Sequence, residues 1–212
     1  MGSAGAAQPL RRDAERNRRR LLAAAREVFS ERGLRATLDD VAERAGVGVG
    51  TAYRRFANKD ELIDAVFDDI MEQVEALARE AAEDPDAWRG LTTSVEKVCE
   101  LQAFDRGMRE VMLSVGGRRR QAEIGRRVAP IVDGLVERAK RQGSLRDDVR
   151  PVDLPMIQLM VAGVSDQTGQ PELWRRYLRL IFDGMRAEPG ATEPLPEGGL
   201  VAAPVAAVEP GA

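Results

Sequence analysis

The chain has 212 residues, 43% of them hydrophobic and 32% charged, a balance that supports a packed core and excludes a wholly disordered chain. It contains no His and one Cys, which excludes a His-dependent catalytic triad, a His-ligated metal and an internal disulfide bond. The net charge of −3 is unevenly distributed, because residues 1–60 carry 13 basic and 8 acidic side chains whereas residues 61–212 carry 19 and 27.

This distribution attaches a segment of net charge +5 to a remainder of net charge −8, which suits a polyanionic partner bound at one end. No run approaches the roughly 18 apolar residues that span a bilayer, so we expect no membrane contact. The single Cys and the lack of an export signal in residues 1–10 predict a cytoplasmic protein. Three pairs of adjacent acidic residues have no His or Cys nearby, namely Asp39-Asp40, Asp68-Asp69 and Asp147-Asp148. We therefore expect neither a metal nor a cofactor.

The N-terminal part begins with residues 1–10, which are small and flexible and predict a disordered arm. From Arg11 an Arg-rich helix is indicated by apolar residues that recur every three or four positions, and Gly33 ends it. The apolar residues of this helix are Leu21, Leu22, Ala25, Val28 and Phe29.

Two short helices follow. Thr37 with Asp40 three residues later resembles a capping box that opens the first of them, and Gly46 closes it. Val47 lies in the turn, where it would plug a small core, and a third helix follows with Tyr53 and Phe56. Two short helices joined by such a turn are typical of a helix-turn-helix, so residues 11–57 predict a three-helix DNA-binding domain.

The rest of the chain is predicted to be helical. Asn58 followed by Glu61 predicts the start of a long helix that runs to about Glu83. Further helices are predicted over residues 85–104, 106–115, 118–142, 154–167 and 172–187. The fold class is therefore all-α with about nine helices, and residues 58–187 form a second helical domain. Residues 188–212, which hold 5 Pro and 4 Glu and no basic residue, predict a disordered acidic tail.

The helix after the turn has the chemistry of a DNA-binding surface. Its exposed positions include Thr51, Tyr53, Arg54 and Arg55, whose hydroxyl and guanidinium groups donate to phosphate oxygens. The spacing alone leaves one alternative open, an ordinary helical corner with a solvated charged face.

The run AGVGVGTAYRRFANKDEL, with the Arg-rich helix before it, resembles the DNA-binding domain of the TetR family of bacterial transcriptional regulators. The spacing Gly-Thr-x-Tyr-x-x-Phe and the entry Asn-Lys-Asp-x-Leu carry the resemblance. It implies that Thr37 meets the DNA backbone. The remaining predicted contacts to bases, sugars or phosphates come from Gly48, Val49, Gly50, Thr51, Tyr53, Arg54, Arg55 and Lys59. The family often has Ser at the position of Gly48 and His at that of Arg55, so the bases that are read need not be the same.

The resemblance also implies a homodimer whose interface is formed by the last two long helices. The dimer would bind a near-palindromic operator in double-stranded DNA. The candidate interface residues are Leu159, Met160, Gly163, Tyr177, Leu178, Ile181 and Phe182. The alternative for each of them is a place in the core of one chain.

The middle helices are implied to bind a small apolar effector whose binding releases the operator, as in ligand-responsive repressors. Met repacks around varied ligands, and six of the seven Met follow the DNA-binding region. The candidate pocket residues are Met71, Trp88, Cys99, Phe104, Met108, Met112 and Ile124. Plain core packing is the alternative for each. For the whole chain the alternative is a small helical ligand carrier or enzyme with an incidental helix-turn-helix, although no nucleophile and base pair supports catalysis and we expect no enzyme.

Overall fold

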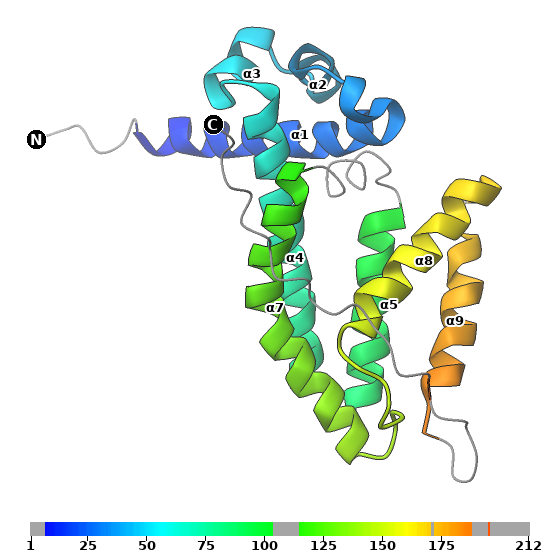
Figure 1. Ribbon diagram of the computed structural model, residues 1–212. Helices are drawn as coiled ribbons and strands as arrows, with labels where there is room; N and C mark the ends of the chain where they lie inside the picture. The colour runs from blue at the N-terminus through cyan, green and yellow to red at the C-terminus, as the bar shows by residue number, and fades with distance from the viewer. Residues whose placement is uncertain (1–6, 104–114, 171, 188–194, 196–212) are drawn as a thin grey trace, which may run out of the picture.

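A computed structural model describes residues 7–103, 115–170, 172–187 and 195 (Figure 1). These residues form α-helices, one short 3₁₀ helix and connecting loops. An isolated antiparallel β-bridge pairs Leu145 with Arg186. The all-α prediction is confirmed. The helices are α1 (Ala7–Arg32), η1 (Gly33–Arg35), α2 (Leu38–Ala45), α3 (Val49–Arg55), α4 (Lys59–Glu83), α5 (Ala87–Ala103), α7 (Val115–Arg141), α8 (Asp153–Thr168) and α9 (Leu173–Met185). None of them is long and apolar enough to cross a membrane.

The N-terminal helices pack around a first hydrophobic core. The C-terminal half of α1, both short helices α2 and α3, and the first three turns of α4 surround this N-terminal core. Its members include Leu21 and Phe29 from α1, Val41 from α2, and Leu62 and Phe67 from α4, all of which are almost fully buried. Each follows the three- and four-residue spacing of the sequence, so one face of each helix supplies the core.

A second hydrophobic core lies between α5, α7, α8 and α9, with the last turns of α4 at its edge. Trp88 and Leu91 of α5 meet Val136 of α7 and Trp174 and Leu178 of α9 in this C-terminal core. The rings of Trp88 and Phe182 pack edge to face, with centroids 6.2 Å apart. Because α4 takes part in both cores, one continuous helix joins the two halves of the molecule (Figure 1).

The turn between α4 and α5 is held from α7. Arg138 donates to the carbonyls of Ala82 at 2.7 Å and Asp84 at 2.7 Å, which satisfies the last carbonyls of α4. Gln142 accepts from the backbone N–H of Ala87 at 2.9 Å at the start of α5. These contacts lie 54 to 56 residues apart in the chain, so only the folded bundle assembles them.

Two predicted boundaries are wrong. Residues 7–10, expected in the disordered arm, belong to α1. Pro9 is tolerated there because the first turn of a helix needs no backbone donor. The helix expected from residue 118 begins three residues earlier, because Val115, Gly116 and Gly117 form the first turn of α7.

Some predictions fall outside the described residues. The helix predicted over residues 106–115 falls almost wholly in the stretch 104–114, so the structure describes eight of the nine or so expected α-helices. Of the predicted acidic tail only Leu195 is described, and its backbone N–H donates to Asp148 at 2.8 Å. Its disorder stays a prediction, as does that of residues 1–6.

Candidate nucleic-acid interface

The first short helix of the helix-turn-helix starts at a complete capping box. Thr37 Oγ1 accepts from the backbone N–H of Asp40 at 3.2 Å, and the Thr37 backbone N–H donates to the Asp40 carboxylate at 2.8 Å. The Thr37 hydroxyl also donates to the Asp40 carboxylate at 2.7 Å. This hydrogen bond, then that of the Thr37 backbone N–H and the nearby Arg32 guanidinium, lower the pKa of Asp40. The start of α2 is therefore fixed by interactions within four residues, as the sequence predicts.

The turn between α2 and α3 depends on Gly46, whose φ of 62° is in the left-handed region. The Gly46 backbone N–H donates to the carbonyls of Ala42 and Glu43, which ends α2. Val47 is partly buried against the N-terminal core, as expected for a residue that plugs the turn. Arg20 of α1 donates to the Gly46 carbonyl at 3.4 Å, so α1 also contacts the turn.

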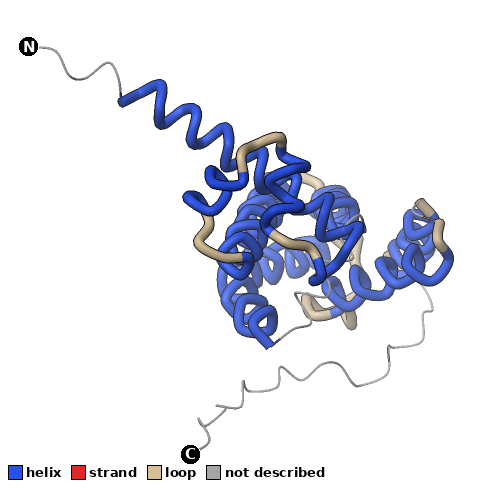
Figure 2. Tube along the Cα trace, turned by 90° about the horizontal axis from the view of Figure 1, so that it is seen from above, coloured by secondary structure: helices blue, strands red, loops and turns tan. Residues whose placement is uncertain are grey.

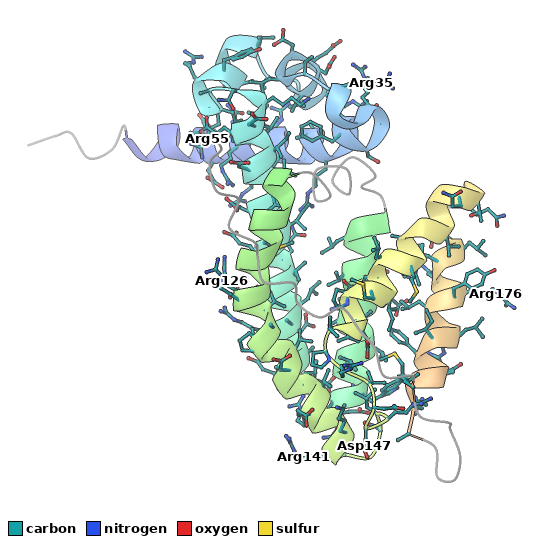
Figure 3. The ribbon with its side chains drawn as sticks, viewed as in Figure 1. Arg35, Arg55, Arg126, Arg141, Asp147 and Arg176 are labelled. Carbon is teal, nitrogen blue, oxygen red and sulfur yellow. The ribbon has the colours of Figure 1, made fainter. Side chains whose placement is uncertain are left out.

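The second short helix, α3, turns one side to the core and the other to solvent. Ala52 is fully buried, whereas Val49 and Tyr53 are 45% and 49% exposed. Arg55 is exposed as well (Figure 3). So is Arg54, which donates to Thr51 Oγ1 at 3.1 Å. Apolar, hydroxyl and guanidinium groups thus share one open surface, which can make both phosphate and base-edge contacts.

The N-terminal end of α3 has no capping side chain and little side-chain cover. Gly48 occupies the N-cap position with extended backbone and makes no side-chain cap. A Cβ added at Gly50 would meet nothing within 4 Å, and both glycines are exposed. The backbone at this end of α3 is therefore open to a close approach by another molecule.

Tyr53 has a partner that the sequence does not reveal. The charge of Asp39 on α2, and then the hydrogen bond between the two side chains, raise the pKa of Tyr53. Asp39 is itself exposed, so one carboxylate lies within the otherwise basic surface of the two short helices. The spacing of 14 residues across a turn gave no signal for this contact.

The remaining predicted DNA contact lies at the start of α4. Asn58 caps this helix by accepting from the backbone N–H of Glu61 at 2.9 Å, as predicted, and Lys59 is its first residue. Lys59 is half-buried and lies four residues after the end of α3. The nine predicted contact residues thus come from the caps of α2 and α3, from α3 itself and from the first turn of α4.

The predicted effector pocket is not brought together by the described residues. Met71 belongs to the N-terminal core, whereas Trp88 and Cys99 belong to the C-terminal core. Trp88 and Cys99 lie eleven residues apart on α5, or about 16 Å along its axis. The other four, Phe104, Met108, Met112 and the side chain of Ile124, lie outside the described residues.

The predicted dimer residues divide into two groups. Leu178 and Phe182 are buried in the C-terminal core and Ile181 packs against it, because α9 turns these positions toward α5. Leu178 and Phe182 therefore belong to the core of one chain, and their predicted place in an interface is wrong, whereas that of the half-buried Ile181 stays a prediction. Leu159, Met160 and Tyr177 are between 42% and 59% exposed, and Gly163 is half-buried. Leu180, which the sequence reasoning missed although it lies three residues after Tyr177, is 57% exposed.

Comparison with known proteins agrees with this geometry. The profile of the bacterial regulatory proteins of the tetR family matches residues 21–66, and that of the SbtR-like transcriptional regulator C-terminal domain matches residues 84–187. ArpR of Pseudomonas putida, described as a probable HTH-type transcriptional regulator, is 33% identical over 153 residues, which is 71% of this chain and 69% of ArpR. The fatty acid metabolism regulator protein of Bacillus subtilis is 26% identical over 156 residues, or 70% and 79% of the two chains.

Solved structures give the same result. A TetR transcriptional regulator from Streptomyces coelicolor superposes with a TM-score of 0.65 at 27% identity, over 80% of this chain and 98% of that one. A TetR regulator from Mycobacterium vanbaalenii superposes with a TM-score of 0.64 at 28% identity, over 84% and 99%. The proteins named here are described as regulators. With its matching sequence, its helix-turn-helix and its all-helical fold, the chain belongs to the TetR family of bacterial transcriptional regulators.

Proposed function

We propose that residues 11–57 bind an operator in duplex DNA with α3 in the major groove. The observation that carries the proposal is the exposed face of α3, where Val49, Tyr53, Arg54 and Arg55 lie beside a bare N-terminal end. In a helix-turn-helix the N-terminal residues of the second helix contact base edges. Gly48, Gly50 and Thr51 therefore face the bases or the nearest phosphates. Thr37 and Lys59 contact backbone phosphates on either side, as the family resemblance implies.

The regulator acts as a homodimer through the outer faces of α8 and α9. Leu159 and Met160 of α8 and Tyr177 and Leu180 of α9 are large apolar side chains that remain exposed in one chain. Buried positions on the same helices face the C-terminal core, so the exposed set faces away from it. Exposed apolar side chains gathered on adjoining helices are typical of an interface. A two-fold dimer calls for a near-palindromic operator.

Residues 58–187 form the regulatory and dimerisation domain, and a small apolar effector bound there weakens operator binding. The effector must prefer the conformer in which the two copies of α3 are wrongly spaced for the operator. The effector then lowers the affinity for DNA by the same factor by which DNA lowers the affinity for the effector. The helix α4 takes part in both cores and connects the effector domain to the DNA-binding end. The Bacillus subtilis relative named for fatty acid metabolism makes fatty acids and their thioesters the first compounds to test.

The DNA-binding proposal is tested by selecting duplexes from a randomised pool with the full-length protein and measuring affinity by fluorescence anisotropy. We expect Tyr53→Ala combined with Lys59→Ala to weaken binding at least roughly tenfold while the melting temperature stays near that of the unmodified protein. Arg126→Ala, an exposed arginine on α7, is the matched control and should bind normally (Figure 3). Failure of the unmodified protein to enrich any sequence would reject the proposal.

The dimer and the effector need separate measurements. Leu180→Arg places a charge in the proposed interface, and sedimentation should show a monomer, whereas Tyr53→Ala should leave the dimer intact. A persisting Leu180→Arg dimer would place the interface elsewhere. An effector that binds the native protein alone raises its melting temperature and lowers its affinity for the selected duplex.

A further inference from the structure

The helix α1 is longer than the N-terminal core requires. Its 26 residues extend over about 39 Å, but its buried side chains begin only at Leu21. Of the side chains described before Leu21, those of residues 13–20, none is buried. Figures 1 and 2 both show the N-terminal turns of α1 standing clear of the other helices. A helix without tertiary contacts gains little stability from propensity alone, so packing does not account for this extension, residues 7–20.

The extension is strongly basic. Residues 11–20 hold six Arg against one Asp and one Glu, a net charge of +4 within ten residues. Arg16 pairs with Asp13 at 2.8 Å, and Arg19 pairs with Glu15 at 3.4 Å. These pairs support the local helix, but all four side chains are at least half exposed. Exposed pairs of this kind are weak, so the two guanidinium groups can exchange a carboxylate for a phosphate.

The extension begins next to the turn that precedes α3, where Arg20 contacts it. Its guanidinium donates to the carbonyl of Gly46, two residues before the Gly48 N-cap of α3. Arg16 lies four residues before Arg20 and therefore on the same face of α1. The extension leaves the N-terminal core beside the beginning of α3, which is the end that approaches the bases in the proposed complex.

We propose that the extension of α1 is a second DNA-binding element, in which Arg16 and Arg19 bind backbone phosphates of the duplex that flanks the site contacted by α3. This inference rests on the proposed DNA-binding function. The residues available are arginines on an exposed helix, which position a protein on the phosphate backbone without reading sequence. In a homodimer the two extensions lengthen the bound duplex at both ends.

The test uses the full-length protein and a duplex it selects from a randomised pool. One version carries about ten flanking base pairs on each side, one helical turn, and the other is trimmed to the inverted repeat. Affinity is measured over a range of salt concentrations. We expect Arg16→Ala combined with Arg19→Ala to lower the slope of log affinity against log salt by about 1.8 per protomer, and the affinity roughly tenfold or more, on the long duplex only.

Two matched double variants separate charge, position and folding. Arg16→Lys with Arg19→Lys keeps the positive charge and should keep most of the slope. Arg126→Ala with Arg141→Ala removes the same charge from exposed positions on α7 and should change neither slope nor affinity (Figure 3). Since Ala is a strong helix former, the helical content by circular dichroism should be unchanged in the variants that carry it.

The outcomes distinguish this inference from the function on which it rests. If the unmodified protein selects no duplex, the proposed function fails and the extension has no role in it. If a duplex is selected but trimming and the Arg16→Ala, Arg19→Ala change leave the slope unaltered, the inference is overturned and the proposed function stands. Equal losses on the long and the trimmed duplex would overturn the assignment to flanking DNA.

Discussion

The carboxylate of Asp39 on α2 lies close enough to Tyr53 on α3 for its negative charge to raise the pKa of the Tyr53 hydroxyl, with hydrogen bonding between the two side chains as the smaller cause. A negative charge therefore lies beside the surface proposed to bind phosphate. To bind a phosphate, Tyr53 must give up this partner, and Asp39 must approach a polyanion. We therefore expect Asp39 to oppose DNA binding and to lower its affinity.

Asp39→Asn should move the pKa of Tyr53 down toward its ordinary value of 10.0 and should raise operator affinity by roughly threefold at low salt, an effect that fades as salt is added. Ultraviolet titration of tyrosinate in a Tyr177→Phe background follows Tyr53 alone, because the chain has two Tyr. The stabilisation from this contact is full below pH 10 and is lost as pH rises through the folded pKa of Tyr53. Asp133→Asn, an exposed change on α7, should alter neither the pKa of Tyr53 nor the operator affinity. An unchanged operator affinity in Asp39→Asn would contradict the prediction.

Gly50→Ala separates stability from binding. No atom lies within 4 Å of an added Cβ, and Ala is a better helix former than Gly by up to about 1 kcal/mol, so the variant should unfold at a higher urea concentration. The same methyl group stands where the proposed complex brings DNA close, and operator affinity should fall roughly tenfold. A more stable protein with undiminished affinity would show that DNA does not approach the backbone at Gly50.

Thr37→Ala removes the side-chain half of the capping box and should cost about 1 kcal/mol in the free energy of unfolding by urea. The pKa of Asp40 is lowered by Thr37, so its contribution is present at neutral pH and is lost as pH falls through that depressed pKa. The variant should therefore lose less stability between neutral and acid pH than the unmodified protein does. Thr93→Ala, an exposed change inside α5, is the matched control and should not destabilise.

Gly90→Ala tests the close approach of α5 to the end of α4. An added Cβ would lie 2.5 Å from the backbone oxygen of Ala81, which cannot move without disturbing the turn held by Arg138. We expect a loss of about 1–3 kcal/mol in the free energy of unfolding. Gly134→Ala on α7 is the same substitution in an exposed helix with open space, and it should gain about 0.5–1 kcal/mol. Equal effects at the two positions would refute the steric argument.

Cys99 should be inert in the folded protein. Burial, with the charges of Glu96 and Glu100, raises the pKa of this thiol to about 12, and the reactive form of a thiol is the thiolate. Ellman's reagent should label the native chain only as fast as it unfolds and should label the denatured chain at its single Cys at once. Rapid labelling of the folded protein would show that Cys99 is accessible.

Local signals in the sequence were enough for most helix boundaries and for the helix-turn-helix. The capping box at Thr37, the glycine turn at Gly46 and the N-cap at Asn58 each depend on residues no more than five positions apart, so they can be recognised before the chain is folded. The composition of α3 indicated its chemistry in the same way. Boundaries at Ala7 and Val115 were missed because the first turn of a helix tolerates Pro and Gly.

Contacts between distant helices could not be inferred in this way. Leu178 and Leu180 are the same residue type two positions apart on α9, yet they are 2% and 57% exposed, because the packing of α9 on α5 decides which side faces the core. The same applies to the Asp39 contact of Tyr53 and to the hold of Arg138 on α4. The sequence by itself determined the family, the helices and the chemistry of the DNA-binding surface, since short-range bonding encodes them. Tertiary structure alone decided which apolar and charged side chains remain available to a partner, because burial depends on how the helices pack.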